Sequence, residues 1–382
     1  MHSILWIVIL IIVYGSLFPF NFQWVEVSQI AWRDWATQLH HRTTNGDILS
    51  NFLTFVPLGY FGYVGTRWFD QKLLLKALLV CLWGGVFAFC LQLAQFFLPS
   101  RVPTLGDALI NLIGVITGVT VAICIKHWLN RSPQVALRWP SKLSIPLTML
   151  VIWLLYQLFP YLPSFTIDNL AKSSQGLWRV PVFIWYEWVF LTAMWFWFFI
   201  YLNYSSIKPY RFRSILLLVS GIVIAKLFIA HNHLELTQML AVFIALLLTY
   251  LYPFKGWKVP HLIVFTLVVI FREMYPFNIT RESFSFNWIP FHYYLSGSMW
   301  VNTQLFLEKL FIYGCLIHLW SEFWQAKNPR QKYRGMFIAG GIILLIELLQ
   351  LVTRFQMADV TDIIIAGLIG YSFHQFKRVN QT

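Results

Sequence analysis

The stretch RVPTLGDALINLIGVITG, residues 101–118, carries ionisable and amide side chains inside sequence that is otherwise strongly apolar. Arg101 opens the stretch, and Asp107 and Asn111 follow with a spacing of four residues between them. A guanidinium can bind a phosphate or a carboxylate through two parallel hydrogen bonds. A carboxylate can accept a proton or a hydrogen bond from a substrate. These residue types therefore indicate a place where a polar group is held at the start of an apolar helix.

A second group of polar residues lies near the C-terminus. Glu347 and Gln350 are one helical turn apart, and Asp359 and Asp362 have the same spacing further on, with Arg354 between the two pairs. Ionisable side chains in membrane-spanning segments are costly, so they usually face a cavity or a partner. Three neighbouring carboxylates raise the pKa of at least one of them, because like charges resist joint ionisation. Glu347, Asp359 and Asp362 are therefore candidate catalytic residues, and a satisfied structural network is the alternative.

The helix that is expected to follow Arg101 presents polar residues and glycines on one face. The residues of this face are Asp107, Asn111, Gly114 and Gly118. The glycines allow a neighbouring helix to approach closely. We expect Asp107 to pair with Arg101 at the positive end of the helix dipole, and Asn111 to bond to Gln92 or Gln95.

This arrangement has two interpretations. It is either a polar clasp that locks two helices together, or a clasp that also lines a substrate groove. In the second case the expected binding residues are Arg101, Asp107, Asn111, Gln95, Gln350 and Arg354.

The composition is that of a membrane protein. Of the 382 residues, 58% are hydrophobic and only 11% are charged, against about 25% charged in soluble domains. The net charge of +13 would suit a nucleic acid, but the basic residues fall in short loops, so no nucleic-acid partner is expected. The four cysteines are scattered, and His231 and His233 beside Glu235 are weak evidence for a metal. We expect neither a metal nor a cofactor.

Apolar runs of membrane-spanning length predict an all-α, polytopic membrane protein with about twelve transmembrane helices. If both termini are cytoplasmic, the inner segments hold 18 of the 28 Lys and Arg residues and the outer segments hold eight. This bias fits a multi-pass protein of the inner (plasma) membrane. The tryptophan-rich segment Trp24–Arg42 is expected to form an interfacial helix on the outer side.

Several polar positions recur along the chain. Three pairs share an offset of 255 residues, namely Gln92 with Glu347, Gln95 with Gln350, and Asp107 with Asp362. The first and ninth runs end alike, in LFPFN and MYPFN, and the fifth ends in the related YQLFPY. We therefore predict a four-helix unit at residues 1–130, a second at 259–382, and between them, at 131–258, a degenerate unit or a linker bundle. In the middle segment Lys226 falls where Glu347 falls.

These marks resemble the VanZ-like family. The resemblance rests on LFP in the first run, NFLTFVPLG (51–59), QLAQFFLPSR (92–101) and GDALINLIGVITG (106–118). The first unit matches the family pattern at Gln95, Arg101, Asp107, Asn111, Gly114 and Gly118, but has Gln92 in place of Glu and Thr104 in place of Asp. The last unit keeps Glu347, Gln350, Asp359 and Asp362, but has Gln356 in place of Arg and Ala366 in place of Asn.

The resemblance implies an integral membrane protein of the bacterial cell envelope, similar to one that lowers sensitivity to the glycopeptide antibiotic teicoplanin. We expect it to bind or modify a lipid-linked glycan or peptidoglycan precursor in a groove open to the outer leaflet, with membrane lipid as the other partner. Binding without chemistry and carboxylate-dependent catalysis both stay open. A secondary transporter and a non-catalytic membrane scaffold are the alternatives from other classes.

Two further charged pairs are weaker candidates for the site. Arg272 and Glu273, near a helix end, are expected to extend toward the membrane surface. Glu308 and Lys309 are adjacent in sequence, so they are expected to face different directions.

Overall fold

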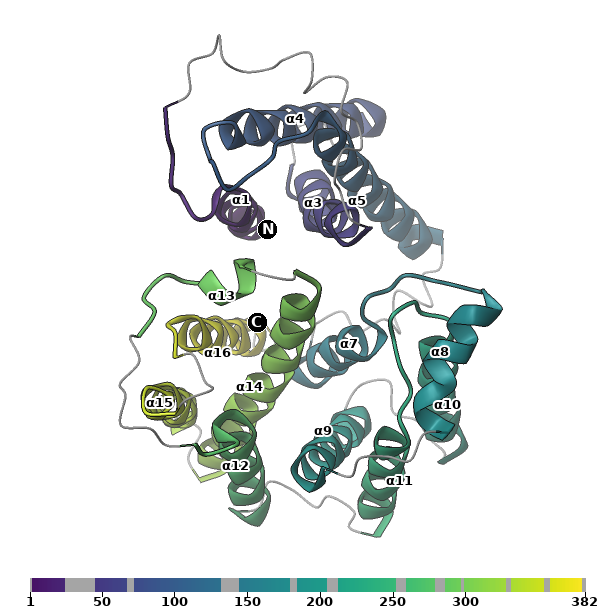
Figure 1. Cartoon of the computed structure of the whole chain (residues 1–382), viewed down its shortest axis with the longest axis vertical. Helices are drawn as coiled ribbons and strands as arrows, with labels where there is room; N and C mark the ends of the chain where they lie inside the picture. Colours follow the sequence, from purple (N-terminus) through teal and green to yellow (C-terminus); the bar gives the residue numbers. More distant parts are fainter. Residues whose placement is uncertain are drawn as a thin grey trace. The chain divides into compact units, whose positions relative to one another are not determined.

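The computed structural model describes residues 2–24, 45–66, 72–131, 144–178, 184–204, 212–251, 259–278, 286–296, 299–327, 331–353 and 358–379. All regular elements in these segments are helices. The chain divides into two compact units (Figure 1), which are described separately below. Unit 1 comprises residues 1–139 with 295–299, and unit 2 comprises residues 140–294 with 300–382.

Among the residues that the structure describes, unit 1 contains four helices, drawn in purple to blue in Figure 1. They are α1 (His2–Leu17), α3 (Asn45–Gly65), α4 (Leu73–Gln95) and α5 (Leu105–Arg131). Helices α3 and α5 approach each other closely because glycines lie at their contact. A Cβ atom on Gly118 would lie 2.0 Å from the carbonyl oxygen of Val56, and one on Gly114 would lie 2.5 Å from that of Phe52. The predicted role of these two glycines in close helix packing is confirmed.

Unit 2 contains ten helices within the described residues. They are α7 (Ile145–Leu158), α8 (Ile167–Trp178), α9 (Trp185–Tyr204), α10 (Phe212–Leu227), α11 (Leu236–Leu251), α12 (Val259–Met274), α13 (His292–Leu295), α14 (Met299–Lys327), α15 (Lys332–Gln350) and α16 (Thr361–Val379). Helix α7 shows how local sequence sets a boundary. The Ser144 hydroxyl accepts a hydrogen bond from the Leu147 amide, and a proline lies in the first turn, where its missing N–H costs nothing.

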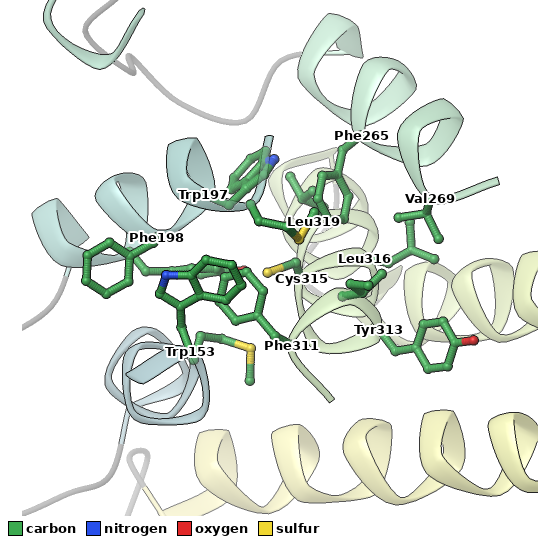
Figure 2. Packing of buried hydrophobic residues seen from close by; sticks show 14 of the residues in the cluster. Trp153, Trp197, Phe198, Phe265, Val269, Phe311, Tyr313, Cys315, Leu316 and Leu319 are labelled. Carbon is green, nitrogen blue, oxygen red and sulfur yellow. The ribbon is translucent and has the colours of Figure 1, made fainter. Parts of the chain in front are cut away.

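One apolar core joins the helices of unit 2 (Figure 2). Trp153 of α7, Phe198 of α9, Phe265 of α12 and Phe311 of α14 are all fully buried in it. The predicted segments 131–258 and 259–382 thus share one core. In Figure 2 the hydroxyl of Tyr313 points away from the labelled aromatic rings, so α14 serves the apolar core with one face and a polar site with another.

A helix occupies each of the twelve predicted membrane-spanning runs. Within the described residues, four helical segments are long and apolar enough to cross a membrane, namely 48–65, 73–95, 105–127 and 333–350. The full count of spans and the cytoplasmic placement of the termini stay predictions. The predicted interfacial helix at 24–42 lies, apart from Trp24, outside the described residues.

We predict that Gly118→Ala destabilises unit 1. The added methyl group would collide with the Val56 carbonyl and with the Tyr60 amide nitrogen, which lies 2.7 Å from its ideal position. Such overpacking costs about 1–3 kcal/mol, measurable as a lower unfolding temperature in detergent. Gly340→Ala in α15 is the control, because no atom lies within 4 Å of its added methyl group. Equal stability of the two variants would contradict the close α3–α5 contact.

Candidate functional site

In unit 1, side chains from the turn between α4 and α5 hold the end of α1. The Gln95 amide donates to the carbonyl oxygen of Ser16 at 2.9 Å. The Arg101 guanidinium donates to the carbonyl oxygens of Gly15 at 3.0 Å and Phe18 at 3.1 Å. The last carbonyls of a helix have no partner within the helix, so these bonds satisfy groups that burial would otherwise leave costly.

The start of α5 is bonded in the same way. The Thr104 amide donates to the side-chain oxygen of Gln92 at 3.2 Å, and the Asp107 amide donates to the Thr104 hydroxyl at 3.0 Å. The buried Asp107 carboxylate accepts from the Asn51 amide of α3 at 2.9 Å. We call Gln92, Gln95, Arg101, Thr104 and Asp107 the polar clasp.

The polar clasp corrects two sequence expectations. The bonds that the Arg101 side chain forms within the described residues go to backbone carbonyls, not to Asp107. The expected bond between Asn111 and Gln92 or Gln95 is also absent from the described residues. Asn111 is 3% exposed, and its side-chain oxygen has no donor there. Both errors have one cause, since spacing along a helix does not fix which backbone groups of a neighbouring helix need a partner.

In unit 2, ionisable side chains from four helices and one loop gather around the start of α16. We call this the acid cluster, and its members are Arg272, Glu273, Glu308, Lys309, Glu347, Asp359 and Asp362. All five carboxyl groups are at most 9% exposed. Five carboxyl groups face two cations in this set, so the cluster would be strongly negative if every carboxyl group were ionised.

Asp362 lies at the centre of the acid cluster. Its carboxylate accepts from the Lys309 ammonium and from the Tyr313 hydroxyl, the latter at 2.5 Å, both on α14. The Lys309 ammonium also lies 3.7 Å from the Glu273 carboxylate at the end of α12. Lys309 therefore provides the positive charge for two buried carboxylates on different helices.

Glu347 and Asp359 connect this centre to the loop before α16. The Asp359 amide donates to the Glu347 carboxylate at 2.9 Å, and the Thr361 amide donates to the Asp359 carboxylate at 2.7 Å. The Glu347 and Asp362 carboxyl groups also lie within hydrogen-bonding reach of each other. Burial and the neighbouring Asp362 raise the pKa of the Asp359 carboxyl group, as expected for carboxylates held close together.

The acid cluster contains a second ion pair, formed by Arg272 and Glu308. The Arg272 guanidinium donates to the Glu308 carboxylate at 3.1 Å, and the Tyr156 hydroxyl donates to the same carboxylate at 3.0 Å. Tyr156 belongs to α7, in the middle segment of the chain. The middle segment therefore contacts the acid cluster through Tyr156, while all members of the cluster belong to the segment 259–382.

The sequence analysis missed four residues of the acid cluster. Arg272 and Glu273 do not extend away from it, and Glu308 and Lys309 both face it. The available signal was the cost of placing an ion in an apolar helix, which applies to Glu308 and Lys309 as it does to Glu347. Arg354, predicted as a binding residue, lies outside the described residues.

The two units repeat the same hydrogen bonds. Gln95 donates to the carbonyl of Ser16, and Gln350 donates to that of Glu273 at 3.0 Å. The Thr104 amide donates to Gln92, as the Asp359 amide donates to Glu347. Each pair of bonds uses residues 255 or 257 positions apart.

The middle helices form similar hydrogen bonds, but from residues at shifted positions. The Asn232 side chain donates to the carbonyls of Gln157 and Phe159, both at 2.9 Å, at the end of α7, as Arg101 does at the end of α1. The backbone bonds Asn232 N to Ile229 O and Ile229 N to Lys226 O match those from Arg101 to Leu98 and from Leu98 to Gln95. Lys226 therefore occupies the position of Gln95 and Gln350 in this pattern. The sequence predicts a different alignment, in which Lys226 matches Glu347, three residues before Gln350.

The comparison with protein families agrees with this geometry. A family model described as VanZ/LLP1 matches residues 5–126. The N-terminal unit is a VanZ-like domain. The match contains the whole polar clasp, which therefore belongs to the VanZ-like domain, and it confirms the resemblance predicted for this part of the chain. Neither the curated proteins nor the solved structures include a significant match.

The VanZ-like domain and the apolar helices make this a membrane protein. Within the described segments, no three His, Cys, Asp or Glu side chains are arranged to hold a metal ion. The chemistry that the acid cluster can offer is acceptance of hydrogen bonds, transfer of protons between carboxyl groups, and pairing with a cation.

We predict that Lys309→Met strongly destabilises the protein. Asp362 and Glu273 would keep buried carboxylates without their shared cation, and breaking a buried pair costs about 3–5 kcal/mol. Unfolding of the protein in detergent micelles measures this loss. The control is Lys172→Met, because Lys172 and its partner Asp168 are 68% and 74% exposed and such surface pairs contribute about 1 kcal/mol or less. Adding Asp362→Asn to Lys309→Met should restore part of the stability, and equal losses in the two lysine variants would contradict the assigned role of Lys309.

Proposed function

We propose that this VanZ-like membrane protein binds a lipid-linked or glycan-bearing component of the bacterial envelope through the acid cluster. The observation that carries the proposal is the side chain of Asp362. Asp362 is 1% exposed, and one of its two carboxylate oxygens has no donor within the described residues as long as Glu347 is ionised. A buried acceptor without a donor is costly, and a hydroxyl or amide group of a bound glycan or peptide would supply that donor.

The surroundings of Asp362 support binding of a polar ligand. Lys309 keeps 15% of its side chain exposed, so the acid cluster is not sealed on that side. Glu347 and Asp359 add further acceptors next to Asp362. Acceptors from two helices and a loop could hold several hydroxyl groups of one sugar ring.

Catalysis is the second form of this proposal. Two carboxyl groups within hydrogen-bonding reach, Glu347 and Asp362, can exchange a proton, which is the basic requirement for acid–base catalysis. In that case Glu347, Asp359 and Asp362 would act as acid, base or acceptor on the envelope component. An effect on sensitivity to teicoplanin-type antibiotics would follow from either form, since both act on the envelope.

A secondary transporter is less well supported. The polar clasp of unit 1 lies at the end of α1 and α4 and at the start of α5, and Glu273, Glu347 and Asp362 of unit 2 lie at the corresponding helix ends. Glu308 and Lys309 lie in the interior of α14. Transporters of the repeat type place their substrate near the middle of the membrane, where helices are broken. A scaffold role remains the alternative if the carboxylates serve only to hold the helices together.

We predict that Glu347→Gln and Asp362→Asn reduce binding of the envelope component while keeping the fold. In Glu347→Gln the side-chain oxygen could still accept from the Asp359 amide, and in Asp362→Asn the Lys309 ammonium would keep Glu273 as its partner. The amount of lipid-linked precursor that co-purifies with each variant, quantified by mass spectrometry, should fall about tenfold, the value of one charge-assisted hydrogen bond.

Asp168→Asn on α8 is the matched control, because this carboxylate is exposed and lies outside the acid cluster. Teicoplanin sensitivity of cells that carry each variant gives a second readout. If both cluster variants keep wild-type stability, co-purified precursor and antibiotic sensitivity, the proposed binding and catalytic roles are both excluded and the scaffold role stands.

A further inference from the structure

The middle helices of unit 2 and Gln304 of α14 line a polar cavity, open on one side, that contains no member of the acid cluster. Its volume is about 210 Å³, enough for about seven water molecules at 30 Å³ each. It lies at the end of α7 and α10 and the start of α11, and its polar lining includes Gln157, Lys226, His231, His233, Glu235 and Gln238.

The cation of this cavity is Lys226, which is only 7% exposed. Its ammonium donates to the side-chain oxygens of Gln157 at 3.3 Å and Gln238 at 3.0 Å. Both partners are neutral amides, and no carboxylate of the described residues lies within ion-pair distance of Lys226. An ammonium has three N–H groups, so one remains for a ligand. Glu235 lines the same cavity and interacts with Lys226 from beyond ion-pair distance. The buried ammonium therefore has no direct counter-ion, which is costly and favours an anion in the cavity.

The comparison between repeats explains why Lys226 is free for this role. The side-chain amides of Gln95 and Gln350 each donate to a backbone carbonyl at a helix end, that of α1 for Gln95 and that of α12 for Gln350. In the middle helices Asn232 takes over that task by bonding to the carbonyl of Gln157. Lys226 instead contacts the Gln157 side chain and lines the cavity.

The cavity lies beside a helix with the marks of a membrane interface. Helix α8 is held against the α10–α11 turn, because the Leu234 amide donates to the Ser173 carbonyl at 2.8 Å and the Asn169 side chain donates to the Leu227 carbonyl at 3.0 Å. The ends of α8 and its preceding residue Phe165 expose large apolar side chains, with Ile167 at 85% and Trp178 at 83%. Helices of this kind are suited to the lipid headgroup region, so a lipid headgroup is a candidate ligand for the cavity.

We infer that this cavity binds a phosphate-bearing group, with Lys226 as its charged ligand. The imidazoles of His231 and His233 at the exposed rim can add donors to the phosphate oxygens. Glu235, also exposed at the rim, disfavours a dianion, so a singly charged phosphodiester such as a lipid headgroup fits better than a doubly charged phosphate. The inference rests on the cavity and Lys226 alone and does not depend on the proposed function of the acid cluster.

The test is binding of soluble probes to the purified full-length protein in a phosphate-free, uncharged detergent. Short-chain dihexanoyl phosphatidylglycerol tests the phosphodiester, inorganic phosphate tests the free anion, and dihexanoylglycerol tests the acyl chains alone. We expect the phosphatidylglycerol probe to bind, and Lys226→Gln to weaken this binding at least about tenfold, because a charge-assisted bond is lost. Gln238→Glu should weaken this binding by a similar factor, because the new carboxylate would form an ion pair with the buried Lys226 ammonium and neutralise its charge.

Lys172→Gln is the charge-matched control, since this exposed lysine lies outside the cavity lining. The Lys172→Gln protein should bind the phosphatidylglycerol probe as tightly as the wild type does.

Tighter binding of phosphatidylglycerol than of phosphate supports a lipid headgroup, and equal binding supports free phosphate. Absence of binding by both phosphate probes, or unchanged affinity in Gln238→Glu and Lys226→Gln, overturns the inference. If Lys226→Gln does not fold, Gln238→Glu decides. Glu347→Gln, in the acid cluster, should keep phosphate binding. The phosphate site and the proposed function of the acid cluster can therefore fail independently of each other.

Discussion

The structure of unit 2 depends on the pairing of charges inside an apolar set of helices. Lys309 is the cation that Asp362 and Glu273 share, and those three residues come from α14, α16 and α12. An isolated ion in an apolar interior costs several kcal/mol, so each helix can occupy its place only when the others supply their charges. This requirement fixes the rotation of each helix about its axis, which apolar contacts alone would leave poorly specified.

The same logic, in neutral form, applies to unit 1. The polar clasp uses side-chain amides, one guanidinium and one hydroxyl group to satisfy the free backbone groups at the end of α1 and the start of α5. Three helix ends have a common backbone form, in which an aromatic residue after a proline has positive φ. These residues are Phe20, Tyr161 and Phe277, and each donates its amide to the carbonyl three residues earlier. This backbone form recurs at the three helix ends, while the side chains that bond to it differ.

Much of this could be predicted from sequence, because it depends on local pattern. Apolar run length predicts where the helices lie, and the spacing of Gly114 and Gly118 predicts a close helix contact. The proximity of Glu347, Asp359 and Asp362 also follows from spacing and a short connection. The pairing of Lys309 with Asp362 could not be predicted, because it depends on which face of α14 meets α16. The partners of Arg101 were missed because a backbone carbonyl leaves no mark in a sequence.

The position shared by Gln95, Lys226 and Gln350 carries an amide in two places and an ammonium in the third. At that position the chain accepts a full positive charge without changing the backbone that surrounds it, since Asn232 holds the neighbouring helix end instead. In the middle helices, Asn232 maintains the helix end, and Lys226 is the residue proposed to meet the ligand. The two tasks fall on different side chains there, so the ligand-facing position could change its charge while the bond that holds the helix end is kept.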